Sequence, residues 1–235
     1  MPALTTLSEE RRIVAVGDIH GCVRTLEALL RAIEPGPDDQ LVFLGDMIDR
    51  GPSSRQVVEL LLRLERRCSC HFIAGNHELM LLEAIATGNP DAWLRSGGMA
   101  TVESYDGLLP MEFPPEHLGL LRRCRTHVET EHYLFVHGGI DPELTVAENL
   151  RFHEPETFSW RREHLQSPYL EEGGFPWEKT VVCGHTPVPA PLLTENLIAL
   201  DTGCVFTGRA HLGTLSAIIL PERRIINRKN IETHP

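Results

Sequence analysis

The sequence lacks the features that mark membrane, repeat and disordered proteins, which leaves the class of ordinary globular proteins. It has no apolar run long enough for a signal peptide or a membrane span, no internal repeat and no low-complexity segment. None of its six cysteines belongs to a CxxC pair or to a Cys/His box with zinc-finger spacing, so we expect small, buried and reduced thiols. These absences predict a single domain over residues 1–235, located in the cytoplasm and without a membrane partner.

Positive charge is scarce as well. The chain carries 33 acidic and 22 basic side chains, which give a formal net charge of −11. Proteins that wrap nucleic acid neutralise its phosphates with lysine and arginine, so we expect no nucleic-acid partner. An acidic chain can still take a phosphorylated substrate, because bound cations reverse the sign of the charge in a local site.

Short apolar strands are present in both halves of the chain. In the first half we predict strands at residues 12–16, 41–44 and 71–74, each followed by a glycine and a polar residue. A helix is predicted after each of these strands, with apolar residues at helical spacing in the first two and with the third helix at about residues 77–88. The order β-α-β-α-β-α favours parallel strands with right-handed crossovers.

The second half returns to strands after an irregular stretch. Strands are predicted at residues 133–136, 180–183 and 197–200, with a closing hairpin over residues 215–226. Residues of about 90–130 are predicted to form a small helical insertion that borders the site. The predicted fold class is therefore α/β, with central β-sheets flanked by helices and a site at the carboxyl ends of the strands.

Five short blocks of metal-ligand residues lie at these strand ends. They are GDIHG (17–21), GDMIDRGP (45–52), GNHE (75–78), HGG (137–139) and GHT (184–186). Imidazole nitrogens combined with carboxylate and amide oxygens suit Mn, Fe or Zn. The blocks hold too many candidate ligands for one tetrahedral zinc, which favours two divalent metals that share a bridging carboxylate.

The first three blocks resemble the signatures GDxHG, GDxxDRG and GNHE of the phosphoprotein phosphatase family of metallophosphoesterases. All three are unbroken, and the resemblance extends from about residue 12 to about residue 220. The chain is most similar to compact bacterial and phage members such as the phage lambda protein phosphatase. The segments that support this are AWLRSGG (92–98), SWRRE (159–163), GHTP (184–187) and DTGCVF (201–206). The resemblance implies the calcineurin-like metallophosphoesterase fold.

The resemblance also implies a role for each metal ligand. The implied ligands are Asp18 and His20 for the first metal, Asp46 as the bridge, and Asn76, His137 and His185 for the second metal. We expect two divalent ions, with Mn as the leading candidate and Fe or Zn as alternatives.

Four further residues have implied roles in the chemistry. His77 would be the general acid that protonates the leaving oxygen, with Asp49 orienting its ring. Arg50 would bind the phosphate oxygens, and alignment on the SWRRE segment points to Arg162 as a second phosphate ligand, with Arg161 as its competitor. An alternative for Asp49 is a loop ion pair with Arg50.

Other phosphate-transfer mechanisms lack their motifs. The residue six positions after each cysteine is never arginine, which excludes the Cys-x5-Arg loop of phosphocysteine enzymes. A DxD nucleophile motif and a G-x-x-x-x-G-K-[ST] loop are also absent. The resemblance then implies direct attack by a metal-bridging hydroxide, without a covalent phosphoenzyme.

The leading functional hypothesis is a serine/threonine protein phosphatase that acts on a phosphoprotein or a small phosphate ester. The alternative is a symmetrical dinucleoside tetraphosphate hydrolase, which shares the same metal blocks. We expect the insertion to separate the two, because a nucleotide needs a stacking surface, and its aromatic residues are Trp93, Tyr105 and Phe113. A catalytically dead binding module would have lost a ligand, His77 or Arg50, and all of them are present. The oligomeric state stays open.

Overall fold

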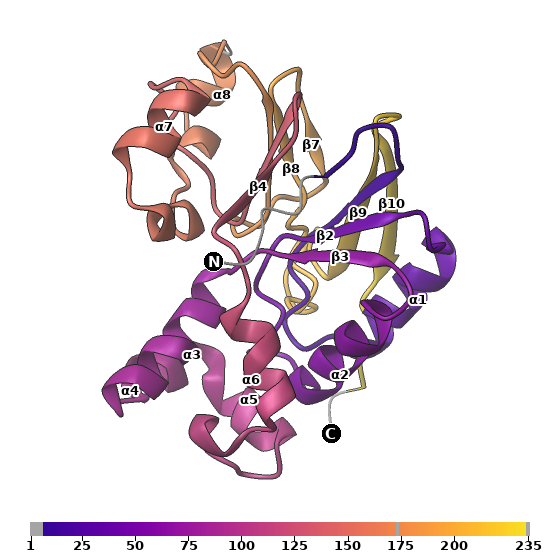
Figure 1. Cartoon of the computed structure of the whole chain (residues 1–235), viewed down its shortest axis with the longest axis vertical. Helices are drawn as coiled ribbons and strands as arrows, with labels where there is room; N and C mark the ends of the chain where they lie inside the picture. Colours follow the sequence, from indigo (N-terminus) through magenta and orange to yellow (C-terminus); the bar gives the residue numbers. More distant parts are fainter. Residues whose placement is uncertain (1–6, 173, 234–235) are drawn as a thin grey trace.

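The chain forms two β-sheets that pack face to face, with helices on their outer sides (Figure 1). This computed structural model describes residues 7–172 and 174–233. The first sheet has the strand order β10-β9-β1-β2-β3 and the second has the order β4-β5-β6-β8-β7. The predicted α/β class, with sheets flanked by helices, is therefore confirmed.

The strands of the first sheet are β1 (Ile13–Val16), β2 (Gln40–Phe43), β3 (Ser69–Phe72), β9 (Thr214–Leu220) and β10 (Arg224–Lys229). The strands of the second sheet are β4 (His127–Glu129), β5 (Tyr133–Val136), β6 (Thr180–Cys183), β7 (Leu192–Leu193) and β8 (Leu197–Ala199). The helices are α1 (Val23–Ile33), α2 (Ser54–Leu64), α3 (Asn76–Thr87), α4 (Asp91–Trp93), α5 (Met99–Ser104), α6 (Pro115–Arg122), α7 (Val146–Phe152) and α8 (Tyr169–Glu172). Short helical turns lie at Leu94–Gly98, Pro110–Glu112, Pro155–Ser159 and Glu163–Leu165.

Alternating side chains explain why the central strands are apolar throughout. In β1, Val14 and Val16 pack under the helices of the first sheet, while Ile13 and Ala15 face the second sheet. Phe135 of β5 enters the same core between the sheets, together with residues from β6, β8 and β9. A strand that is buried on both faces carries no polar alternation, which is the pattern of the sequence.

The helices of the first half follow the predicted spacing. Leu26, Leu29 and Ile33 of α1 are buried, and the helix ends where Glu34 adopts a left-handed conformation just before a proline. Strands β1 and β2 pair in parallel, as do β2 and β3. Strand β1 also pairs with β9 in antiparallel register, from Ile13 opposite Leu220 to Val16 opposite Ala217. The closing hairpin is therefore an integral part of the first sheet.

The insertion is mainly helical, and it packs on the outer side of the first sheet. Trp93, Tyr105 and Phe113 belong to the core beneath these helices. Its last residues form β4 instead of a helix, and β4 pairs with β5 in the second sheet. The predicted helical insertion thus contains helices between Asp91 and Arg122 and a strand at His127–Glu129.

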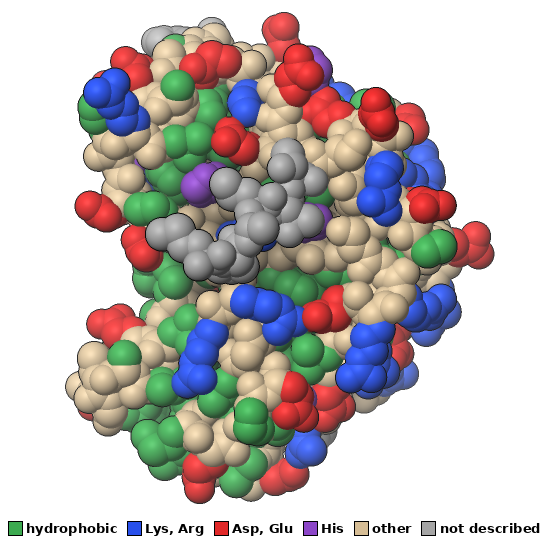
Figure 2. All heavy atoms as spheres, in the orientation of Figure 1, with side chains coloured by type: hydrophobic (Ala, Val, Ile, Leu, Met, Phe, Trp, Pro, Cys, Tyr) green, Lys and Arg blue, Asp and Glu red, His purple; other side chains and the backbone are tan. Residues whose placement is uncertain are grey.

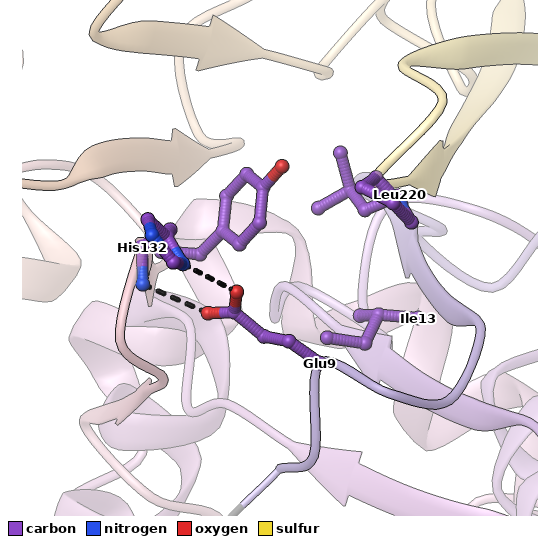
Figure 3. A pocket seen from close by; sticks show the side chains of 6 residues that line it. Glu9, Ile13, His132 and Leu220 are labelled. Carbon is purple, nitrogen blue, oxygen red and sulfur yellow. Dashed lines mark hydrogen bonds and ion pairs between the residues drawn. The ribbon is translucent and has the colours of Figure 1, made fainter.

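The N-terminal segment joins the two sheets at one edge. Glu9 precedes β1, and its carboxylate accepts hydrogen bonds from the main-chain N–H and the ring of His132, at 2.8 Å and 2.6 Å (Figure 3). Acidic and basic side chains are interspersed over the face seen in Figure 1, without a continuous basic stripe (Figure 2). Among the described residues, no helix has the length and apolar character needed to cross a bilayer.

Candidate active site and metal centre

All of the predicted metal ligands come together at the carboxyl ends of the strands. Asp18 and His20 follow β1, Asp46 follows β2, and Asn76 opens α3 after the loop that follows β3. His137 follows β5 and His185 follows β6 of the second sheet. The site therefore lies across the seam between the two sheets. Parallel pairing brings the loops after β1, β2 and β3 to one edge of the first sheet, and the packing of the two sheets adds the loops after β5 and β6.

The backbone is unusual where the site residues lie. Among the non-glycine residues with positive φ are five of the predicted site residues: His20 (46°), Asp46 (46°), Asp49 (71°), Arg50 (67°) and His185 (65°). L-residues rarely adopt this region, and such conformations cluster at functional sites. A side chain on Gly75 is excluded too, since an added Cβ would lie 2.1 Å from Oδ1 of Asp46.

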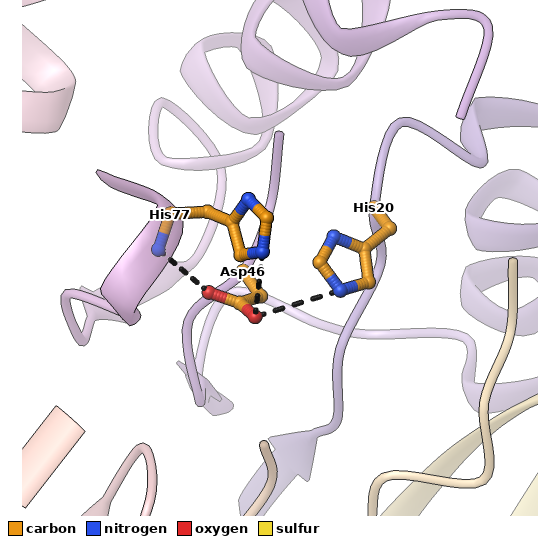
Figure 4. Close-up of side chains that lie close together, drawn as sticks. All are labelled: His20, Asp46 and His77. Atoms are coloured by element: carbon orange, nitrogen blue, oxygen red, sulfur yellow. Dashed lines mark hydrogen bonds and ion pairs between the residues drawn. The ribbon is translucent and has the colours of Figure 1, made fainter. Parts of the chain in front are cut away.

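Asp46 lies between two groups of potential ligands. Its Oδ2 is 3.5 Å from Nε2 of His20 and 4.0 Å from Nε2 of His77 (Figure 4), and its Oδ1 is 3.3 Å from Nε2 of His137. One group of converging ligand atoms comprises His20, Asp46 and His77, and the other comprises Asp46, His137 and His185. A carboxylate with one oxygen toward each group has the geometry of a bridging ligand.

Main-chain carbonyls fix the imidazole rings. Nδ1 of His20 lies 3.0 Å from the carbonyl oxygen of Ile48, and Nδ1 of His137 lies 2.8 Å from that of Leu44. If each Nδ1–H donates to its carbonyl, each Nε2 keeps a lone pair directed into the site. Nε2 of His137 is also 3.2 Å from Nδ1 of His185 and 3.2 Å from Oδ1 of Asn76.

Asp18 is buried at the back of the site. Both of its carboxylate oxygens accept from the main-chain N–H of His185, at 3.1 Å each. Burial, followed by the negative charge of Asp201, raises the pKa of Asp18 well above its usual range. The three-residue group that contains His20 includes His77 and not Asp18. The structure thus places Asp18 in the site, while its assignment to the first metal stays a prediction.

The buried carboxylates of the site need positive charge. Burial and the charge of Asp46 raise the pKa of Glu78 to about 7, and burial raises the pKa of Asp201 to about 6. Burial acts on Asp46 in the same direction, but the charges of His137 and His77 outweigh it and lower the pKa of Asp46 well below its usual range. Divalent cations would supply the positive charge that this cluster needs, so the donor set fits metal binding.

The histidines fit the same conclusion. Burial lowers the pKa values of His20 and His185 to about 3, so both rings are neutral and able to bind a metal at physiological pH. Burial also acts to lower the pKa of His137, but the charge of Asp46 outweighs it and raises that pKa to about 10. The protonated ring of His137 can therefore balance the negative charge of Asp46. A metal cation bound beside Asp46 would balance that charge instead.

Glu78 was not predicted as a site residue, although it belongs to the GNHE block. Its carboxylate accepts from the main-chain N–H groups of Asp46 at 2.9 Å, Met47 at 2.8 Å and Gly75 at 2.9 Å. The side chain thereby holds the loops after β2 and β3 together. Its position in the block, at N3 of α3, was the available signal.

His77 and Asp49 form a fully buried pair. Nδ1 of His77 lies 2.7 Å from Oδ2 of Asp49, and the same carboxylate accepts from Nε1 of Trp93 at 2.8 Å and from Oγ1 of Thr101 at 2.6 Å. The loop ion pair between Asp49 and Arg50 considered from the sequence is not among the ion pairs of the described residues. Nε2 of His77 is buried without a hydrogen-bond partner there and faces Asp46. No sequence pattern pointed to Trp93 and Thr101 as partners of Asp49.

The predicted phosphate-binding arginines flank the metal ligands. Nη1 of Arg50 is 2.6 Å from Nε2 of His20, and Nη2 of Arg162 is 2.6 Å from Nε2 of His185. Arg161 is directed elsewhere, toward Asp141 at 3.4 Å. Of the two arginines that the sequence left in competition, Arg162 is therefore the one that lines the site.

The ligands open into a cleft of about 380 Å³. Its lining residues are Asp46, Arg50, Asn76, His77, Met80, Ser96, Trp160, Arg162, His185, Pro187, Phe206 and Arg209. The insertion does not provide the stacking surface that a dinucleoside tetraphosphate hydrolase would need there, because its aromatic residues are almost fully buried: Trp93 (1%), Tyr105 (1%) and Phe113 (3%). The aromatic side chains of the cleft are Trp160 and Phe206, which come from other loops.

A calcineurin-like phosphoesterase family model matches residues 11–212, and the chain belongs to this family. It is 30% identical over 211 residues to serine/threonine-protein phosphatase 1 of Salmonella typhimurium, over 87% of this chain and 92% of that protein. It is 27% identical to a symmetrical bis(5′-nucleosyl)-tetraphosphatase of Janthinobacterium, over 92% and 95% of the two chains.

A solved structure described provisionally as a diadenosine tetraphosphatase has 25% identity and a TM-score of 0.70, and the match covers 99% of this chain and 97% of that one. The resemblance to the phosphoprotein phosphatases seen in the sequence is thus confirmed, and the chain is a metallophosphoesterase. The relatives differ in the substrates that their names give.

Proposed function

We propose that this cleft hydrolyses phosphoserine and phosphothreonine in proteins, as a metal-dependent serine/threonine phosphatase. The observation that carries the chemistry is the position of Asp46 between two sets of nitrogen and oxygen donors. The protein-phosphatase assignment is supported by the match to the Salmonella phosphatase over most of both chains.

The proposed metal ligands are Asp18, His20, Asp46, Asn76, His137 and His185. When bound, two divalent ions would activate water and neutralise charge on the phosphoryl oxygens. Manganese is the proposed metal, because imidazole, carboxylate and amide donors together suit a borderline divalent ion.

The side chains supply positioning and proton transfer. Arg50 presents its guanidinium group beside His20 and Arg162 presents its own beside His185, where each can bind two phosphoryl oxygens. The proposed general acid is His77, whose Nε2 faces the site and whose Nδ1 is paired with Asp49. The carboxylate holds the ring orientation and stabilises the protonated ring.

A second candidate is hydrolysis of a dinucleoside tetraphosphate. It is favoured by the relatives named as tetraphosphatases and by the two cleft aromatics, Trp160 and Phe206, on which a base could stack. Phosphate ester and phosphoanhydride hydrolysis would use the same ligands.

A direct comparison of substrates tests the proposal. Purified protein loaded with Mn is assayed with a phosphothreonine peptide and with diadenosine tetraphosphate, with a chelated sample as control. A higher kcat/KM for the peptide supports the protein-phosphatase proposal, and a higher kcat/KM for the dinucleotide supports the second candidate. Absence of metal-dependent turnover on both substrates and on p-nitrophenyl phosphate would refute the proposed function.

A further inference from the structure

The cleft contains one more arginine than the two assigned to the scissile phosphoryl group. Arg209 lies in the loop between β8 and β9 and lines the same cleft as Arg50 and Arg162. Within the described ranges, none of these three arginines forms an ion pair with a carboxylate. In a chain with a net charge of −11, three unpaired guanidinium groups around one cleft favour a ligand with several negative charges.

Arg209 and Arg50 share one aromatic ring. The guanidinium carbon of Arg209 is 4.7 Å from the ring centroid of Phe206, and that of Arg50 is 5.6 Å from the same centroid. Contacts at this range are attractive cation–π interactions. The ring of Phe206 therefore keeps the guanidinium group of Arg209 close to that of Arg50, which is proposed to bind the scissile phosphoryl group.

The loop that carries this ring is anchored by main-chain and side-chain hydrogen bonds. Asp201 accepts from the N–H of Gly203 at 2.8 Å, Gly203 accepts from the N–H of Phe206 at 2.8 Å, and Phe206 accepts from the N–H of Arg209 at 3.1 Å. Asn230 donates to the carbonyl of Cys204 at 2.8 Å. The position of Arg209 is thus linked through successive turns to a buried carboxylate of the metal site.

We propose that Arg209, positioned by Phe206, is a specificity-determining residue that binds the phosphoryl group adjacent to the scissile one. The cleft then also binds ligands with linked phosphoryl groups, beside the simple monoesters of the proposed function. A guanidinium fork matches phosphoryl oxygens, and a phosphoanhydride places its second anion beside the first without the cost of ordering a peptide. This inference rests on the proposed phosphate hydrolysis at this cleft, and it adds the linked phosphoryl groups of a nucleotide to the phosphomonoesters that the cleft would accept.

Binding of ADP and AMP tests the inference, because the two ligands differ only in the second phosphoryl group. Dissociation constants are measured by calorimetry with Mn in fixed excess, in a His77→Asn background so that neither nucleotide is consumed. We expect tighter binding of ADP, and Arg209→Ala should reduce the preference for ADP over AMP by about tenfold or more, as for loss of one charge-assisted contact. Phe206→Leu should reduce the preference less, because the guanidinium remains but loses its support.

The matched control is Arg228→Ala, which removes an exposed arginine of β10 that is outside the cleft and should leave the preference unchanged. Equal weakening of both nucleotides by Arg209→Ala, or no weakening of either, overturns the inference. It is also overturned if the preference for ADP persists in Arg209→Ala and only acidic phosphopeptides bind more weakly. If the preference depends on Arg209 and the unsubstituted protein hydrolyses diadenosine tetraphosphate but not the phosphothreonine peptide, the inference stands and the proposed function fails.

Discussion

Replacement of Asp49 by asparagine gives the sharpest test of the proposed acid chemistry. The carboxylate is fully buried and accepts from His77, Trp93 and Thr101 at 2.6–2.8 Å. Asparagine keeps the size of the side chain and removes its charge. Its amide oxygen can face the His77 and Trp93 donors while its NH2 group faces Thr101, so we expect the fold to be retained.

The size of the effect follows from the lost charge. A hydrogen bond to a charged group contributes about 1.5–3 kcal/mol, and about 1.4 kcal/mol corresponds to a factor of ten in rate. If the carboxylate stabilises the protonated ring of His77, Asp49→Asn should lower kcat about 10- to 100-fold. The loss should grow as the leaving group becomes a stronger base, since such a group depends most on a proton donor.

The assay compares kcat for phenyl phosphate with kcat for p-nitrophenyl phosphate, in the unsubstituted protein and in the variant, with metal content measured on the same samples. The matched control is Asp106→Asn, which removes an exposed carboxylate paired with Arg55 and should change neither rate. An equal loss for both substrates at unchanged metal content would refute the role of Asp49 in proton donation.

Three further predictions follow from the same geometry. His77→Asn should lower turnover by orders of magnitude with both metals retained, and near-normal turnover would contradict the general-acid assignment. Gly75→Ala would place a Cβ 2.1 Å from Oδ1 of Asp46 and should lower both metal content and melting temperature, unlike Gly119→Ala, whose Cβ meets nothing within 4 Å. Burial lowers the pKa of His71 to about 4. As the pH falls, His71 is therefore protonated in the unfolded chain before it is protonated in the folded protein. The free energy of unfolding should then fall by up to about 2–3 kcal/mol between pH 6.5 and pH 4. Denaturant titrations that give the same pH slope for His71→Asn would contradict this.

The proposed ligands could be grouped from the sequence because each one lies in a short block that follows a strand. Strands β5 and β6 begin and end at the predicted residues, and their apolar runs leave little choice. Strand β3 lies two residues earlier than predicted. Ile73 still donates its main-chain N–H to Phe43 of β2, but it also forms an isolated bridge with Arg125, and the N–H of Ala74 donates to the carbonyl of Arg125. This pairing joins residues that are far apart in the sequence, so the local pattern of apolar residues cannot predict it.

The partners of the site residues were harder to predict. Trp93 contacts Asp49 from 44 positions away, and Thr101 contacts it from 52 positions away. Helix α7 was missed although Thr145 and Glu148 form a capping box at its start, which is a local signal. The cleft aromatics were sought in the wrong segment, because exposure depends on packing and Trp93 faces inward.

The pairing of β1 with β9 bears on how the protein is made on the ribosome. Every proposed metal ligand has been synthesised by residue 185, but the strand that covers the open edge of β1 begins only at Thr214. Until that strand emerges, β1 has unpaired N–H and C=O groups along one side, which is a surface that favours association with other chains. Completion of the first sheet therefore depends on contacts between the two ends of the chain, which fold slowly. A ribosome-bound chain that stops at residue 212 should contain all the ligands and still aggregate more readily than the full chain.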